Sequence, residues 1–184
     1  DVGRYNDAIL RSPAVFPQAD YIILESTYGN KLHDEVHGTP DTLYEWIDKT
    51  CIQKKGKLII PAFSVGRTQE LLYALNQLDL ENRLPNVPIY VDSPLSREAT
   101  EMLKAYPQYF NKHIRKVMER DEDPFDFPGL KFIKTVDESK YLNVLPQPCV
   151  IISASGMADA GRVKHHIMNN ISDEKNTILL VGYC

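Results

Sequence analysis

Short, uninterrupted runs of apolar residues recur along the chain, and segments with helical spacing of apolar residues separate them. The runs predict β-strands at residues 19–25, 58–60, 88–92, 130–136, 149–153 and 177–181. Because these runs do not alternate with polar residues, they are typical of a parallel sheet that is covered on both faces. The sequence therefore predicts an α/β fold, with a doubly wound, mostly parallel sheet flanked by helices.

The segments between the runs predict helices. The first begins with Thr39 as N-cap and Pro40 at the first helical position, and it ends before Gly56. The apolar faces of the first three helices contain Leu43, Trp46 and Ile47; Leu71, Leu72, Leu75 and Leu78; and Ala99, Met102, Leu103 and Tyr106. Residues 137–145 and 159–170 predict two more helices. Residues 1–18 are expected to form an irregular surface connection, and the acidic run 120–129 a solvated excursion.

The stretch 57–69 combines a strand, a break at Pro61 and a polar turn that opens a helix. Such a turn leaves free backbone N–H groups at a helix N-terminus, where the helix dipole favours anions. Residues 91–103 and 152–167 repeat this order of strand, serine-bearing turn and arginine. Right-handed crossovers collect such turns along the carboxyl edge of a parallel sheet, so we expect the three turns to lie side by side.

The polar residues of these turns are candidates for a phosphate-binding edge, because guanidinium groups and short hydroxyls match phosphate oxygens. The candidates are Ser64, Gly66, Arg67, Ser93, Arg97, Ser155, Gly156 and Arg162. For each arginine the alternative is a surface ion pair with a neighbour such as Glu70, Glu98 or Asp159.

Composition narrows the function classes. The 184 residues suffice for one compact domain, and a formal net charge of -4 argues against a general nucleic-acid coat, so any polyanion site must be local. The three cysteines are widely spaced and predict reduced, buried thiols in a cytosolic protein. No apolar run is long enough to span a bilayer, and no G-x-G-x-x-G or Walker motif supports a dinucleotide or ATP site.

The two ends of the sequence predict a fragment of a longer protein. The chain begins at Asp1 without a methionine, and it finishes on the apolar run 176–184. An apolar strand without an exit turn is an aggregation hazard at a free chain end.

Short motifs follow one another in a fixed order from end to end. They are Asp1-Val2-Gly3-Arg4, Glu25-Ser26-Thr27-Tyr28-Gly29 with His33 beyond it, Pro61-Ala62-Phe63-Ser64-Val65-Gly66-Arg67, Val91-Asp92-Ser93-Pro94-Leu95, Ser155-Gly156-Met157 with Gly161-Arg162, and Gly182-Tyr183-Cys184. In this order the motifs resemble the β-CASP branch of the metallo-β-lactamase superfamily. That branch includes bacterial and archaeal ribonucleases and the endonuclease subunit of the eukaryotic cleavage and polyadenylation machinery.

The resemblance implies a Rossmann-like β-CASP domain at residues 19–184, with residues 1–18 as the connection from a metallo-β-lactamase domain of the same parent chain. Asp1 matches an aspartate that bridges two zinc ions, so it is a metal ligand and a catalytic candidate. Glu25 matches the acidic residue that opens the β-CASP region, where it holds a downstream histidine. The serine and arginine turns match the family's phosphate-binding edge for single-stranded RNA.

The resemblance also implies a function for the parent: a cytoplasmic, zinc-dependent ribonuclease that hydrolyses RNA phosphodiesters. The sequence contains no HxHxDH segment and ends before two downstream histidine motifs, so the fragment alone is expected to bind no zinc and to be inactive. A noncatalytic β-CASP scaffold and a small-ligand Rossmann-like enzyme are the alternatives. Endo- or exonuclease action and homodimer formation stay open.

Overall fold

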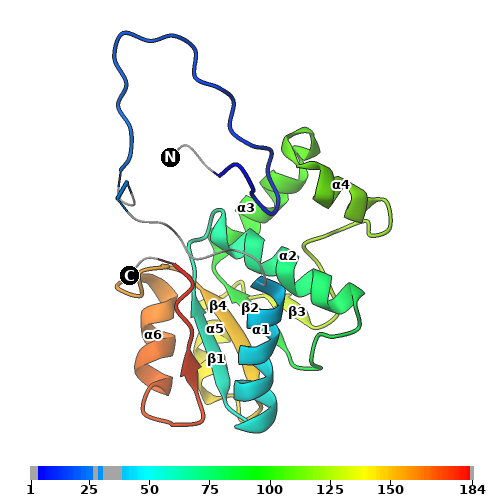
Figure 1. Cartoon of the computed structure of the whole chain (residues 1–184). Helices are drawn as coiled ribbons and strands as arrows, with labels where there is room; N and C mark the ends of the chain where they lie inside the picture. The colour runs from blue at the N-terminus through cyan, green and yellow to red at the C-terminus, as the bar shows by residue number, and fades with distance from the viewer. Residues whose placement is uncertain (1–3, 27–28, 31–38, 183–184) are drawn as a thin grey trace.

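The computed structural model of the chain describes residues 4–26, 29–30 and 39–182. Its centre is a five-stranded parallel sheet in the order β3-β2-β4-β1-β5 (Figure 1). The strands are β1 (Lys57–Pro61), β2 (Ile89–Asp92), β3 (Leu130–Phe132), β4 (Cys149–Ser153) and β5 (Thr177–Ile178). Three of them are shorter than the apolar runs that predicted them: β2 by one residue, β3 by four and β5 by three. The predicted α/β fold with a parallel sheet is confirmed.

Helices cover both faces of the sheet. One face carries α1 (Thr39–Ile47), which continues as a π-helical segment over Asp48–Gln53, and α2 (Arg67–Leu80); the other carries α5 (Val136–Val144) and α6 (Gly161–Asn170). Beyond the carboxyl ends of the strands lie α3 (Pro94–Lys104), a 3₁₀ turn over Pro107–Tyr109 and α4 (Lys112–Met118) (Figure 1). Within the described ranges, no helix combines the length and the apolar character that crossing a membrane requires.

Two hydrophobic cores result from the alternation of side chains along the buried strands. Leu58 and Ile60 pack with Leu72 in the core beneath α1 and α2, whereas Ile59 packs with Val163 in the core beneath α5 and α6. Successive strand residues point to opposite faces, so an all-apolar strand supplies both cores at once. This arrangement explains why the strands read as continuous apolar runs.

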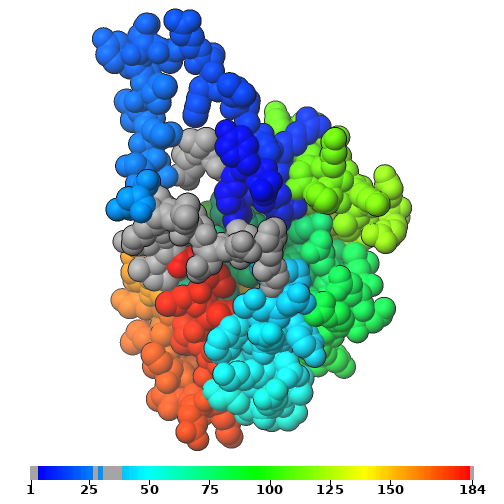
Figure 2. Space-filling model, viewed as in Figure 1, coloured from blue at the N-terminus to red at the C-terminus, as the bar shows by residue number. Residues whose placement is uncertain are grey.

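The apolar run 19–25 is not a strand, so this prediction was wrong. Residues 13–26 form an extended excursion away from the compact body (Figures 1 and 2). Ile23 is fully exposed, and Tyr21 is 93% exposed. A strand needs a hydrogen-bonded neighbour and a layer to bury its side chains, and neither lies beside this run in the part of the chain that the structure describes.

The preceding segment, residues 4–12, is irregular, as predicted, but it is anchored to the body. The carboxylate of Asp7 accepts hydrogen bonds from the amides of Ile9 and Leu10 at 2.8 and 2.7 Å. Ile9 is buried in the core, and Leu10 forms an antiparallel bridge with Phe110.

The acidic run 120–129 was predicted to be a solvated excursion, and the structure corrects this. Phe125 and Phe127 are buried, and the ring of Phe125 packs against those of Tyr73 and Phe110 at centroid distances of 6.4 and 6.1 Å. Burying two aromatic side chains stabilises the fold by about 2 kcal/mol each. In the sequence, the acidic residues beside Phe125 and Phe127 make the whole run look solvated, so the burial of the two rings was not predicted.

Candidate functional site

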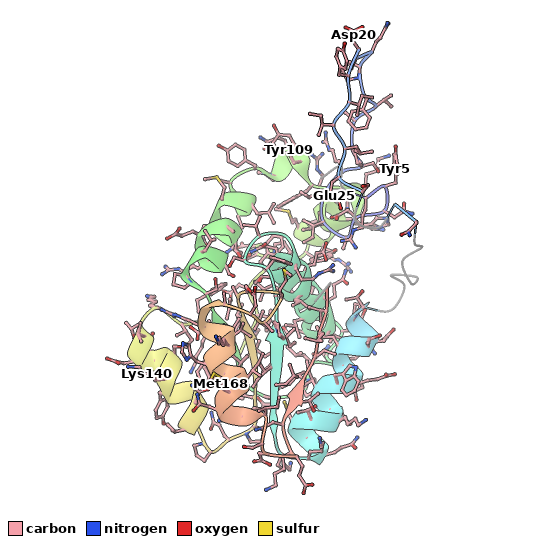
Figure 3. The ribbon with its side chains drawn as sticks, turned by 90° about the vertical axis from the view of Figure 1, so that its left-hand side faces the viewer. Tyr5, Asp20, Glu25, Tyr109, Lys140 and Met168 are labelled. Atoms are coloured by element: carbon pink, nitrogen blue, oxygen red, sulfur yellow. The ribbon has the colours of Figure 1, made fainter. Side chains whose placement is uncertain are left out.

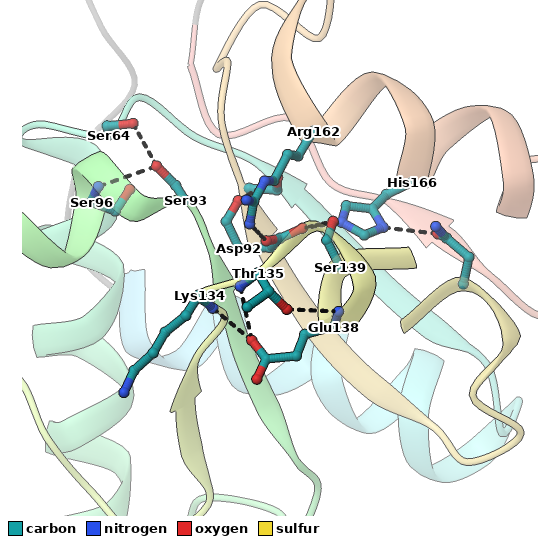
Figure 4. A network of polar contacts seen from close by, with 12 residues as sticks. Ser64, Asp92, Ser93, Ser96, Lys134, Thr135, Glu138, Ser139, Arg162 and His166 are labelled. Atoms are coloured by element: carbon teal, nitrogen blue, oxygen red, sulfur yellow. Dashed lines mark hydrogen bonds and ion pairs between the residues drawn. The ribbon is translucent and has the colours of Figure 1, made fainter. Parts of the chain in front are cut away.

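The three serine-bearing turns meet at the carboxyl edge of the sheet, as predicted. The hydroxyls of Ser64 and Ser93 are 2.9 Å apart, which joins the turns that follow β1 and β2 (Figure 4). The turn after β4 packs against the turn after β1. Gly156 lies so near Phe63 that a Cβ atom at residue 156 would be 2.7 Å from the Phe63 ring. Only glycine allows this approach without movement of the Phe63 side chain.

A buried glutamine at the start of α2 fixes the position of the first two turns. The Gln69 side chain accepts a hydrogen bond from the amide of Gly66 at 2.7 Å. Its amide nitrogen donates to the carbonyls of Ser64 and Ser96 and to the hydroxyl of Thr100, at 3.1, 3.3 and 3.0 Å. Gln69 therefore ties the turn after β1 to α3.

Three backbone amides at the helix starts have partners within the protein, which corrects the expectation that these N–H groups are free. In the first turn, the amides of Arg67 and Thr68 donate to the carbonyls of Val65 and Phe63. In the second turn, the amide of Ser96 donates to the hydroxyl of Ser93 at 3.1 Å. These three amides are therefore not available to an anion, and side chains must supply the contacts in their place.

The three arginines differ in their partners. Arg67 forms an ion pair with Glu70 on the same helix, with Nη1 and Oε2 2.6 Å apart, and Arg4 contacts the same carboxylate. The ion-pair alternative is thus correct for Arg67. Arg97 is exposed and has no ion pair or side-chain hydrogen bond within the described residues. It lines a surface hollow of about 650 Å³ together with Lys134.

Arg162 has a buried partner that the sequence analysis did not consider. Its Nη1 donates to Oδ1 of Asp92 at 2.6 Å, and the Asp92 side chain is fully buried (Figure 4). The second carboxylate oxygen accepts from Ser139 Oγ at 2.5 Å and from His166 Nε2 at 2.7 Å. We call Asp92, Ser139, Arg162 and His166 the carboxylate cluster.

Asp92 is a carboxylate in this cluster. Burial alone would raise the pKa of its carboxyl group, but the hydrogen bonds from His166, Ser139 and Arg162 lower the pKa below the ordinary aspartate value. The ionised form is therefore the one that the folded protein stabilises.

The carboxylate cluster has the residue types of a hydrolytic triad but not its geometry. The Ser139 hydroxyl donates to the carboxylate, so the imidazole of His166 cannot act as its base. Ser139, Asp92 and His166 are also all buried. The cluster supports the edge of the sheet and offers no nucleophile to a substrate.

The remaining candidates have structural partners or lie elsewhere. Ser155 Oγ donates to Asp159 at 2.8 Å. Asp1 lies outside the described residues. Glu25 is exposed at the end of the extended segment, beyond the tip at Asp20, and does not end a buried strand (Figure 3).

The described residues do not fit a zinc site. Residues 4–26, 29–30 and 39–182 contain no group of three or more histidine, cysteine, aspartate or glutamate side chains that could hold a metal ion. Cys51 and Cys149 are buried, and burial raises the pKa of their thiols to about 12 and about 11, so neither is a ready thiolate ligand.

Apolar side chains border the polar edge. Val65 and Leu95, which follow the serine pair in sequence, line a hollow of about 670 Å³ with Met102, Tyr106 and Tyr109. The carboxyl edge thus places hydroxyl and guanidinium groups beside an apolar and aromatic surface.

The sequence analysis missed Asp92, Ser139 and His166 as parts of this edge, although two signals were present. Asp92 directly follows the apolar residues of β2, so its side chain had to lie at the carboxyl edge. Arg162 and His166 are four residues apart on one helix, which places them on the same face.

Comparison with known proteins identifies the family. Ribonuclease TTHA0252 of Thermus thermophilus is 34% identical over the whole chain, which covers 42% of that protein. Transcription termination factor FttA of Methanosarcina mazei is 32% identical over 98% of the chain and 29% of its own length. Cleavage and polyadenylation specificity factor 73 of Drosophila melanogaster is 30% identical over the whole chain and 26% of its own length. The chain thus spans less than half of each relative. The family model described as the Beta-Casp domain matches residues 68–184, more than half of the sequence, so the chain belongs to the β-CASP family.

Proposed function

We propose that the chain is the RNA-clamping β-CASP part of a zinc-dependent ribonuclease of the metallo-β-lactamase superfamily, and that its carboxyl edge holds RNA phosphates. The observation that carries this proposal is the meeting of three serine-bearing turns at one edge, with Arg97 and Arg162 beside them. The names of two relatives, a ribonuclease and a cleavage and polyadenylation specificity factor, support RNA as the polymer.

The side chains of this edge suit a single strand. Arg97 and the serine hydroxyls supply phosphate contacts, which position a strand without reading its bases. The adjoining hollow, with Tyr106 and Tyr109, offers apolar and aromatic surface to unpaired bases. This combination of a charged edge and a stacking surface is typical of proteins that bind single-stranded nucleic acids.

The proposed zinc dependence rests on membership of the β-CASP family. Two zinc ions would supply an activated water for phosphodiester hydrolysis, with Asp1 as one ligand. The other ligands would come from a metallo-β-lactamase domain in the same parent chain. We propose that residues 1–18 connect this metallo-β-lactamase domain to a β-CASP domain at residues 19–184. The parent protein is proposed to be cytoplasmic. The contribution of the described residues is to bind and orient RNA.

Replacing Arg97 tests the phosphate edge. In the complete enzyme, Arg97→Ala should weaken binding of single-stranded RNA almost equally for all sequences. It should also reduce the slope of log affinity against log salt by about 0.7, the value for one phosphate contact. Fluorescence anisotropy at several salt concentrations measures both quantities.

Arg83→Ala is the matched control. Arg83 follows the C-terminal end of α2, whose N-terminus lies at the carboxyl edge, and pairs with Asp41 and Glu81. Equal effects of the two substitutions, or no effect of Arg97→Ala, would refute the phosphate edge. RNA binding without cleavage would instead favour the noncatalytic scaffold.

Glu25 is proposed as a positioning residue that holds a histidine of the metallo-β-lactamase part. Glu25→Gln keeps the size of the side chain but removes its charge, so it should lower the single-turnover cleavage rate by roughly one hundredfold. RNA affinity and zinc content should stay near their wild-type values. Normal cleavage with a lowered melting temperature would instead show that Glu25 only stabilises its loop.

A further inference from the structure

The hydrogen bonds around His166 determine the protonation of its ring. The side chain is fully buried, and both ring nitrogens have partners: Nε2 lies 2.7 Å from Asp92 Oδ2, and Nδ1 lies 2.8 Å from Asn143 Oδ1. The Asp92 carboxylate can only accept, so Nε2 must carry a proton.

The Asn143 oxygen is fixed by a second donor. Asn170 Nδ2 donates to the backbone carbonyl of His166 at 2.8 Å and to Asn143 Oδ1 at 3.1 Å. A backbone carbonyl can only accept, so the Asn170 side-chain atom that contacts the His166 carbonyl must be the NH₂ group. The same NH₂ group contacts a side-chain atom of Asn143, so that Asn143 atom must be the oxygen, and this oxygen also faces His166 Nδ1. His166 Nδ1 must therefore also carry a proton, and the ring is an imidazolium.

The carboxylate cluster consequently carries a surplus positive charge. Asp92 contributes one negative charge, and Arg162 and His166 contribute one positive charge each. Ser139 and Asn143, which face the imidazole from α5, are neutral. The ammonium of Lys57, at the amino end of β1, donates to the backbone carbonyls of Leu142 and Asn143 at 2.9 and 2.7 Å.

Arg162 carries this charge to the surface. Its side chain is 23% exposed, and only Nη1 is bonded to Asp92. The other guanidinium donors have no side-chain hydrogen bond within the described residues. His166 and Ser139 hold the Asp92 carboxylate, which in turn fixes Nη1 of Arg162. The other N–H groups of Arg162 are available to an anion.

We propose that His166 is a positioning residue for phosphate binding: as an imidazolium it fixes Asp92, orients Arg162 and supplies the surplus charge that attracts an RNA phosphate to this edge. The inference rests on the proposed function. It adds that phosphate affinity depends on the positive charge of a buried histidine.

The ring state can be measured directly in the wild-type protein labelled with ¹⁵N-histidine. Long-range ¹H–¹⁵N NMR distinguishes a protonated ring nitrogen from an unprotonated one, and triple-resonance assignment of the wild-type protein identifies the His166 signals. We expect both ring nitrogens of His166 to be protonated. A signal from one protonated and one unprotonated nitrogen would overturn the inference.

Binding of oligouridylate tests the consequence. His166→Gln should bind about fivefold more weakly than wild type, in line with loss of one nearby charge. His165→Gln, at an exposed neighbour, should resemble wild type. Equal RNA affinities of wild type and His166→Gln would overturn this inference alone, whereas a wild-type protein that binds no RNA would overturn the proposed function.

Discussion

Arg67 and Arg162 occupy similar places in two strand–turn–helix units, yet the protein holds them differently. Arg67 pairs with Glu70 three residues away on the same helix, and its side chain is 37% exposed. Arg162 pairs with Asp92, which is 70 residues away and fully buried. A partly exposed helical pair contributes little to stability, whereas a buried carboxylate that loses its charge leaves its partners uncompensated. The same sequence pattern thus yields a local surface pair in one turn and a tertiary anchor in the other.

The largest expected effect comes from Asp92→Asn. The substitution keeps the shape of the side chain but leaves Arg162 and His166 without a counter-charge beneath the sheet edge. We expect the free energy of unfolding to fall by about 3 kcal/mol, as measured by urea denaturation.

Glu70→Gln provides the contrasting variant, because Glu70 is the carboxylate of the surface pair. We expect a loss of less than about 1 kcal/mol in the same urea experiment. Equal losses for the two variants would erase the distinction between the surface pair and the buried anchor.

The next effect is a pH dependence of stability. The pKa of Asp92 is lowered in the folded state, so its contribution is fully present above the unfolded aspartate pKa of about 3.9 and is lost as the pH falls through the folded pKa. The wild-type protein should therefore lose more stability below about pH 4 than Asp92→Asn does. Asp137→Asn, at an exposed carboxylate of α5, should follow the wild-type curve. Parallel curves for wild type and Asp92→Asn would contradict an ionised Asp92.

The fold was predictable from the sequence where a strand is an uninterrupted apolar run. Residues 58–60 and 149–152 are apolar throughout, and both runs lie in inner strands that are buried on two faces. The run 19–25 looks the same in sequence but is exposed, because an apolar run encodes the tendency to form a strand and not the neighbour that it needs. The run 120–129 gave the opposite error. Its acidic residues outnumber its two phenylalanines, so it was predicted to be solvated, but both phenylalanines are buried.

The site was predictable only in part. Strand direction and crossover handedness correctly brought the serine-bearing turns together. The partners of the arginines depended on contacts between distant residues: Asp92, His166 and Ser139 come from β2, α6 and α5, and no local spacing joins all three. Local pairs such as Arg67 with Glu70 can be anticipated from sequence, whereas a buried network requires the packed structure.

The central claim is that the carboxyl edge contacts RNA phosphates, and the arginine side chains report on this most directly. The Nε–Hε NMR signals of assigned arginines can be followed as a single-stranded oligouridylate is added to the protein. We predict that the Arg97 and Arg162 signals shift in a saturable manner, while the signal of Arg83 stays in place. Shifts at Arg83 with unchanged Arg97 and Arg162 signals would contradict the account.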